Sequence, residues 1–125
     1  MMISFQQLEL HKKEAVYVQI IRYVKQKILM NEVHDYDELP SRRELAMQLS
    51  INPNTVQKAY KQLEDEGVIR TISNVKSVIV VNDEMIEHIK EELIESDIKA
   101  FIHNCKNSGL SFQKVIALVS AYWEE

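Results

Sequence analysis

Two short helix signals separated by a tight turn constrain this chain more strongly than any other part of its sequence. Ser41 followed by Glu44 matches a capping box, in which each side chain accepts a hydrogen bond from the other residue's backbone N–H. The apolar residues that follow predict a helix that runs to about Leu49. Residues 50–53, which read Ser-Ile-Asn-Pro, then predict a turn.

A second helix is predicted directly after this turn. Asn52 can cap it, and Pro53 suits its first position because no backbone donor is needed there. The helix runs to about Glu66, and Gly67 is a suitable residue to end it. Two helices joined in this way are the layout of a helix-turn-helix, whose second helix enters the major groove of DNA.

A further helix is predicted ahead of this pair, over residues 15–30, where apolar residues recur at helical spacing. We expect these apolar residues to form one buried stripe, with Arg22, Lys25 and Lys27 lying mostly off it. Residues 31–38 are polar and acidic, and we interpret them as a connector.

A two-stranded hairpin is predicted after the helix pair, because β-branched residues dominate segments 68–72 and 78–81. Residues 73–77 are expected to form its turn, where Asn74 can take the left-handed backbone that glycine otherwise supplies. A hairpin in this place is the wing of a winged helix. The predicted fold class is therefore mostly α (α+β): a winged helix-turn-helix domain with a two-helix C-terminal dimerisation tail.

The last third of the chain predicts those two tail helices. Apolar residues continue at helical spacing from about Asp83, Gly109 stops this helix, and Ser111 caps the last one. The two helices expose more apolar surface than an antiparallel pair can cover, and a second copy of the chain is the simplest partner. We therefore predict a DNA-binding domain over 1–81 and a helical dimerisation region over 82–125. The candidate dimer contacts are Ile89, Leu93, Phe101, Val115, Leu118, Val119, Tyr122 and Trp123.

The second helix of the pair carries a polar face that suits DNA. Asn54 and Gln57 can make paired hydrogen bonds to adenine, and Lys58 and Lys61 can reach guanine or phosphate. Thr55 lies near the helix N-terminus, where free backbone N–H groups also attract phosphate. The alternative is an ordinary amphipathic helix with a solvated polar face, which the neighbouring capped helix, turn and hairpin disfavour.

Further cations lie around this helix, and each has a second interpretation. Arg42 and Arg43 can bind phosphate or a guanine edge in a two-point geometry, or pair on the surface with Glu44 or Glu38. Ser41 is a helix cap rather than primarily a DNA contact. Arg70 and Lys76 on the hairpin either contact DNA or are solvated. The full set of candidate DNA contacts is Ser41, Arg42, Arg43, Asn52, Asn54, Thr55, Gln57, Lys58, Lys61, Arg70 and Lys76.

Charge distribution is compatible with this interpretation although the net charge is −4. Residues 1–81 carry 11 Lys/Arg against 10 Asp/Glu, whereas residues 82–125 carry 4 against 9, so the acidity lies mainly in the tail. Cys105 is the single cysteine, which fits a reducing compartment. With no secretion-like or membrane-spanning apolar run, we expect a cytoplasmic protein without a membrane partner.

An enzyme is disfavoured because no catalytic set, phosphate-binding glycine loop or metal-ligand spacing is present. His34 beside Asp35 and Asp37 could bind a cation, but an acidic solvated loop is the better interpretation. We therefore predict no cofactor and no metal site. The remaining alternative is a winged-helix module that binds proteins rather than DNA.

Several spaced motifs resemble the GntR family of bacterial transcription regulators, over about residues 15–81. They are Tyr17-Val18-Gln19-Ile20, the run Leu39 to Ala46, Asn52-Pro53-Asn54-Thr55-Val56, and the run Ala59 to Gly67. The Asn-Pro-Asn-Thr-Val variant is similar to the YtrA-type subfamily, as are the tail segments Gly109-Leu110-Ser111 and Trp123-Glu124-Glu125.

The resemblance implies a dimer that binds a palindromic operator on double-stranded DNA, usually as a repressor, often of its own operon and of ABC transporter genes. It implies that Arg43 contacts DNA and that Asn54, Thr55 and Gln57 occupy contact positions. It leaves open a small-molecule effector, which the sequence does not identify. The chain departs from the family pattern in its glycine-free hairpin turn, residues 73–77, and in lacking a proline near Ala15.

Overall fold

The computed structural model describes residues 1–73 and 76–125. Asn74 and Val75 lie outside the described residues, so the predicted left-handed backbone at Asn74 is not tested, whereas Ser73 beside it does have a positive φ of 47°. The chain divides into two compact units, residues 1–89 and residues 90–125. The elements are α1 (Val16–Leu29), α2 (Arg42–Leu49), α3 (Pro53–Asp65), β1 (Ile69–Ile72), β2 (Lys76–Ile79), α4 (Asp83–Asn107) and α5 (Phe112–Tyr122).

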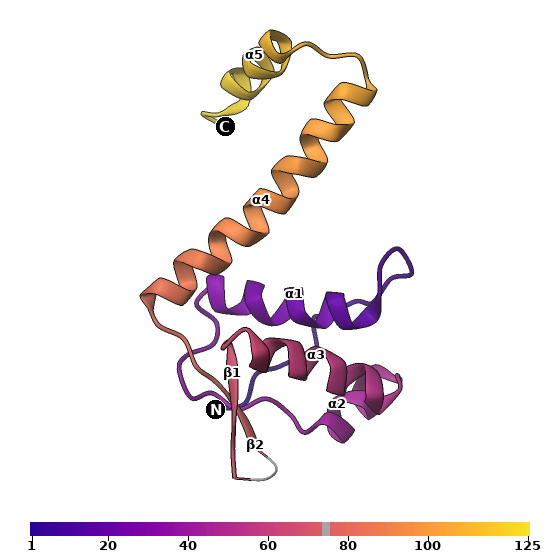
Figure 1. Ribbon diagram of the computed structural model, residues 1–125, viewed down its shortest axis with the longest axis vertical. Coiled ribbons are helices and arrows are strands. Elements are labelled where there is room, and N and C mark those ends of the chain that lie inside the picture. The colour runs from indigo at the N-terminus through magenta and orange to yellow at the C-terminus, as the bar shows by residue number, and fades with distance from the viewer. Residues whose placement is uncertain (74–75) are drawn as a thin grey trace. The chain divides into compact units, whose positions relative to one another are not determined.

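Three helices form the core of the first unit. Helix α3 contacts α1 along one side and α2 along another, as Figure 1 shows. The predicted apolar stripes supply these contacts, and burying them provides the main stabilisation of a domain this small. The buried residues on these stripes are Ile20, Ile21, Val24, Ile28, Leu45, Ala46, Val56, Ala59, Tyr60 and Leu63.

The predicted helix ends are confirmed because they depend on local chemistry. The Ser41 side chain accepts from the Glu44 N–H at 3.1 Å, and the Glu44 carboxylate accepts from the Ser41 N–H, which completes the capping box. Asn52 caps α3 in the same way by accepting from the Asn54 N–H at 2.8 Å. Gly67 follows α3 with a φ of 80°, a backbone conformation that side chains with a Cβ rarely adopt.

The predicted hairpin forms, but its second strand begins earlier than expected. Strands β1 and β2 pair antiparallel, with Ile69 opposite Ile79 and Ile72 opposite Lys76. The strand therefore includes Lys76 and Ser77, which the sequence placed in the turn. The outer edge of β2 is also paired, because the Leu39 N–H donates to the Ser77 carbonyl at 2.9 Å. The end of the predicted connector thus forms an isolated bridge to β2, with Glu38 opposite Val78, while the sheet itself has two strands.

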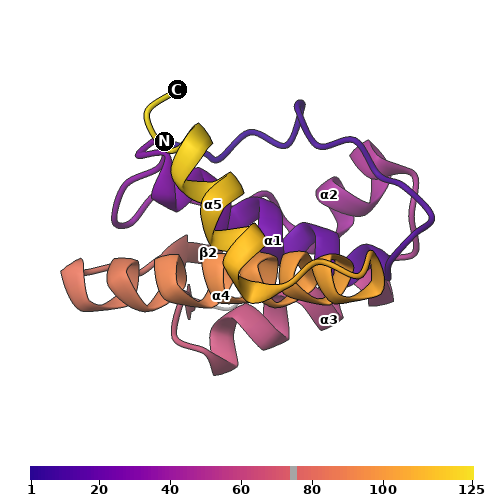
Figure 2. The same cartoon turned by 90° about the horizontal axis from the view of Figure 1, so that it is seen from above.

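The N-terminal segment is packed rather than loose, which the sequence did not predict. Figure 2 shows its extended path before it turns back into α1. Ile3 and Phe5 are buried, and the Phe5 ring stacks on the Tyr23 ring with centroids 5.1 Å apart. The Ile3 N–H donates to the Glu38 carbonyl at 2.8 Å, which ties the segment to the edge of the sheet.

Lys25 corrects the expectation that the cations of α1 lie off its buried stripe. Its side chain is only 2% exposed. Its Nζ lies 2.7 Å from a carboxylate oxygen of Glu66, the residue that ends α3. A buried ammonium requires such a partner because the desolvation of an unpaired charge is costly.

The second unit contains most of α4, a turn at Gly109 and α5. Gly109 has a φ of 75°, and the Ser111 side chain caps α5 by accepting from the Lys114 N–H at 3.1 Å. Cys105 is buried, whereas none of the side chains of α5, all of which the structure describes, is buried. Across the described residues, no helix combines the length and the apolar character needed to cross a bilayer.

Candidate DNA-binding surface

The outward side of α3 carries the polar residues that the sequence selected. Asn54, Gln57, Lys58 and Lys61 are all exposed. The opposite side of the same helix is anchored in the core by Val56, Ala59, Tyr60 and Leu63. The helix is therefore held firmly while its polar side chains stay accessible, which is the requirement for reading base edges.

The N-terminus of α3 places three of the candidate residues together. The Asn52 side chain is occupied as the helix cap, and its own carbonyl accepts from the Thr55 N–H at 3.0 Å. Thr55 is half-buried and Asn54 is exposed. Asn52 thus has a structural role in this chain, and Asn54 is the amide that is available to DNA.

The two lysines of α3 have different surroundings. The Lys58 ammonium lies 4.0 Å from the centroid of the Tyr17 ring, a cation–π contact with the first turn of α1. Lys61 lies 3.5 Å from an Asp65 carboxylate oxygen on the same exposed helix face. Such a surface pair is weak and gives way easily to a phosphate.

Two arginines stand at the start of α2, and only one of them is fully exposed. Arg43 is exposed, whereas Arg42 is half-buried with its guanidinium 5.2 Å from the centroid of the Tyr60 ring. Among the described residues, the buried Nε of Arg42 has no hydrogen-bond partner. The alternative to a DNA contact for Arg42 was a surface pair with Glu44 or Glu38, and the structure instead places its guanidinium over an aromatic ring.

The hairpin cations each contact a residue of the preceding segment. The Arg70 guanidinium donates to the Tyr36 hydroxyl at 3.2 Å and lies over its ring. Lys76 lies 2.9 Å from a Glu38 carboxylate oxygen. Both cations are exposed on β1 and β2, so the wing presents positive charge that is already oriented by neighbours.

The acidic loop before α2 uses its carboxylates to hold backbone. An Asp37 oxygen accepts from the His34 N–H at 2.8 Å, and an Asp35 oxygen accepts from the Val81 N–H at 3.0 Å. These bonds give the three residues a role in fixing the loop and the end of the hairpin.

A helix-turn-helix, a paired wing and an accessible amide-and-lysine face on α3 together define a winged-helix protein of the DNA-binding class. A family model described as bacterial regulatory proteins of the gntR family matches residues 16–79. The chain belongs to the GntR family of bacterial regulatory proteins.

Relatives place the chain within this family. The transcriptional repressor YtrA of Bacillus subtilis (strain 168) is 35% identical over 111 residues, which cover 87% of this chain and 85% of that protein. A GntR family transcriptional regulator from Listeria monocytogenes has a similar structure, with a TM-score of 0.76 and 28% identity over 90% of this chain and 98% of that one. YtrA from Sulfolobus acidocaldarius gives a TM-score of 0.56 and 28% identity over 94% of this chain and 96% of that one.

These similarities confirm the predicted family and its YtrA-type branch. The chain is a DNA-binding transcriptional regulator and not an enzyme. This result also decides against a winged-helix module that binds only proteins.

The sequence did not reveal the tyrosines that support the cations of this surface. Tyr17, Tyr36 and Tyr60 lie under Lys58, Arg70 and Arg42, respectively. Each pair is separated by many residues along the chain, so no local spacing could have indicated the contact. Only the packing of α1, α2 and the connector against α3 and the hairpin brings the partners together.

Proposed function

We propose that this protein is a repressor that binds a palindromic operator as a homodimer, with α3 of each protomer in the major groove. The accessibility of Asn54 and Gln57 on a helix whose other side is anchored in the core carries this proposal. Amides of this kind can pair with the edge of an adenine, and the neighbouring cations can bind the phosphates.

Repression is supported by relatives. The YtrA protein of Bacillus subtilis is named a transcriptional repressor, and it aligns with most of this chain. By the family resemblance, the regulated genes include the protein's own operon and transporter genes. An effector that relieves repression would have to bind the DNA-free conformation more tightly than the DNA-bound one.

Dimerisation is supported by the apolar surface of the second unit. Phe101, Leu118, Val119, Tyr122 and Trp123 are all exposed, and Trp123 is 77% exposed. Exposed apolar side chains of this size on two consecutive helices are typical of an interface between protein chains. Leu93 and Val115 are half-buried at this unit and complete the proposed contact set.

Ile89 is a correction to the predicted dimer contacts. Its side chain is 0% exposed within a single chain. Because it offers no surface to a second copy, Ile89 belongs to the core of its own protomer.

The proposed DNA-contacting face of α3 is tested in two steps. Fragments that the protein binds are first selected from the native genome, and the affinity of variants for the selected duplex is then measured. We expect Gln57→Ala to weaken binding and to relax base preference at one position in each half-site, by about 1–3 kcal/mol of discrimination. Arg43→Ala should weaken binding more, across all sequences. Gln26→Ala, at an exposed glutamine of α1, is the matched control and should bind normally.

Unchanged binding by both the Gln57 and the Arg43 variants would show that the assigned face is wrong. Repression is tested separately by deleting the gene and measuring transcripts from the selected promoters. Increased transcription is expected, and decreased transcription would identify an activator.

A further inference from the structure

Lys58 is held by a residue outside the helix-turn-helix. Its ammonium lies 4.0 Å from the ring centroid of Tyr17, which belongs to the first turn of α1. Lys58 is exposed and Tyr17 is half-buried, so the ring is supported by the protein on one side and meets the cation on the other. A lysine side chain is flexible, and a contact of this kind restricts the positions of its charged end.

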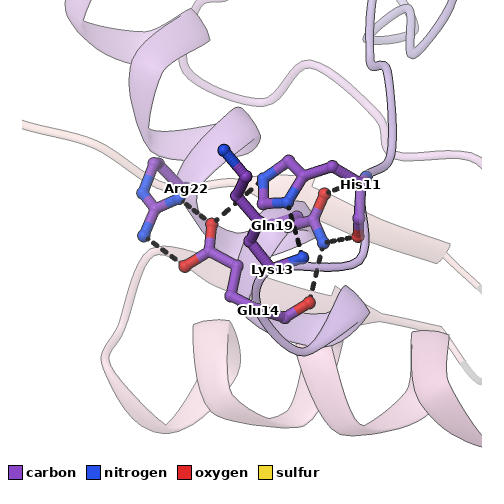
Figure 3. Close-up of polar contacts among 5 residues, drawn as sticks. All are labelled: His11, Lys13, Glu14, Gln19 and Arg22. Carbon is purple, nitrogen blue, oxygen red and sulfur yellow. Dashed lines mark hydrogen bonds and ion pairs between the residues drawn. The ribbon is translucent and has the colours of Figure 1, made fainter.

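The residue ahead of α1 is Ala15, whose side chain cannot cap the helix. The start of α1 is fixed instead by the polar cluster in Figure 3. The buried Gln19 amide ties the loop before α1 to the first turns of the helix. It accepts from the His11 N–H at 3.0 Å and donates to the carbonyls of His11 and Glu14 at 2.8 Å and 2.9 Å.

Arg22 adds a second link to the same cluster. Its guanidinium binds both carboxylate oxygens of Glu14, as the dashed lines in Figure 3 show. These hydrogen bonds hold the pKa of Glu14 below its ordinary value of 4.5. The loop before α1 is thereby fixed at two points, and Tyr17 stands on a well-defined first turn.

We propose that Tyr17 is a positioning residue that holds the Lys58 ammonium in place for a contact with the DNA backbone. The inference rests on the proposed use of α3 as the reading helix. It assigns Lys58 to phosphate rather than to a guanine edge, and it extends the DNA-binding apparatus to α1.

The direction of the side chain supports phosphate. Asn54 and Gln57 lie on the outward face of α3, and this is the face that meets base edges when a helix lies in the major groove. Lys58 lies on the opposite side of Asn54 from Gln57, and its contact with Tyr17 draws the ammonium further towards α1. The walls of the groove beside a bound helix are sugar and phosphate, so an ammonium on the flank meets the backbone.

The experiment compares Tyr17→Phe, Tyr17→Leu, Lys58→Gln and the double variant Tyr17→Leu/Lys58→Gln on two duplexes. One duplex is selected from genomic fragments and the other is a scrambled sequence of the same composition. Kd is measured over a range of salt concentrations, because each lost phosphate contact lowers the slope of log K against log salt by about 0.9. Thermal unfolding is recorded for every variant.

We expect Lys58→Gln to weaken binding to both duplexes by similar factors and to reduce the salt slope by about 0.9 for each bound protomer. Tyr17→Leu should weaken binding about two- to five-fold for each bound protomer, the effect of losing one exposed cation–π contact. Tyr17→Phe keeps the ring and should bind normally. The double variant should bind no more weakly than Lys58→Gln alone.

Lys61→Gln supplies the matched control, since Lys61 pairs with Asp65 instead of an aromatic ring. Its effect should add fully to that of Tyr17→Leu. The inference fails if Tyr17→Leu binds as tightly as the wild type or more tightly, or if its effect persists undiminished in the Lys58→Gln background. It also fails if Lys58→Gln weakens only the selected duplex, which would indicate base readout. Salt-independent binding by the wild type would instead overturn the proposed function.

Discussion

Tyr60 joins the two helices of the helix-turn-helix through one buried hydroxyl group. Its O–H donates to the Pro40 carbonyl at 2.7 Å, just ahead of α2, while its ring lies under the Arg42 guanidinium. Burial raises the pKa of Tyr60 well above its ordinary value, so the hydroxyl remains a donor across the physiological range. One buried hydrogen bond therefore adds to the apolar contacts that hold α2 against α3.

Tyr60→Phe is expected to lower the free energy of unfolding by about 1–3 kcal/mol, because it leaves the Pro40 carbonyl buried without that donor. Urea unfolding followed by circular dichroism measures the change. Tyr17→Phe removes a hydroxyl group from a half-buried tyrosine of α1 while keeping its ring, and it should leave the free energy of unfolding unchanged. Equal stability of the Tyr60 variant and the wild type would mean that this hydrogen bond contributes nothing net.

The sequence predicts which side of a helix a residue occupies, because this depends only on the spacing of apolar residues. Tyr60 was correctly placed on the inward side of α3 by its position in the apolar stripe. The hydrogen bond from Tyr60 to Pro40 and the contact of Lys58 with the Tyr17 ring could not be predicted, since the partners lie in other elements. The burial of Lys25 is unpredictable for the same reason, because only tertiary packing brings the Glu66 carboxylate to its ammonium.

At the scale of elements, the helix ends were predictable and the sheet edges were not. Ser41 and Asn52 act through side chains that reach two or three residues along the chain, so their neighbours in sequence identify them. The first residue of β2 depends instead on which residues of β1 and of the connector pair with it. The same holds for the N-terminal segment, whose order comes from Phe5 stacking on Tyr23.

Ser41 allows the capping and DNA-binding roles of α2 to be separated. Ser41→Ala removes the acceptor for the Glu44 N–H and should lower the free energy of unfolding by about 1 kcal/mol. Ser41→Asp keeps a good cap and adds a negative charge, which the helix N-terminus favours but a DNA phosphate does not. The Asp variant should therefore unfold like the wild type and bind DNA more weakly than the Ala variant does.

Chemical denaturation and fluorescence titration with the selected duplex measure these two effects. Arg43→Ala is the reference for a DNA defect at the same helix end. If Ser41→Asp binds DNA as tightly as the wild type, the start of α2 does not lie near a phosphate.

At the scale of the whole molecule, charge is distributed unevenly along the chain, since residues 1–81 are nearly neutral and residues 82–125 are acidic. Residues 82–125 carry 4 Lys/Arg against 9 Asp/Glu, so this part is repelled by DNA and is suited to another role. Its exposed apolar residues include Phe101, Val119 and Trp123. Pairing two copies through these residues would cover the apolar surface and deliver two reading helices to one duplex.

Trp123→Asp tests this arrangement, because a carboxylate at an apolar interface must be desolvated without a partner. We expect the variant to sediment as a monomer at concentrations where the wild type is a dimer. Its affinity for a full palindrome should fall to that for a half-site, a loss of about 10²-fold or more, since the second contact is no longer intramolecular. Affinity for an isolated half-site should not change.

Gln113→Asp adds the same charge at an exposed polar position of α5 and should remain dimeric. This control separates the loss of apolar contact from a general effect of negative charge. A wild type that sediments as a monomer while it occupies the operator would overturn the dimer. A full palindrome bound equally well by Trp123→Asp and the wild type would show that the tail does not pair the reading helices, and that operator symmetry must be recognised through the DNA-binding units themselves.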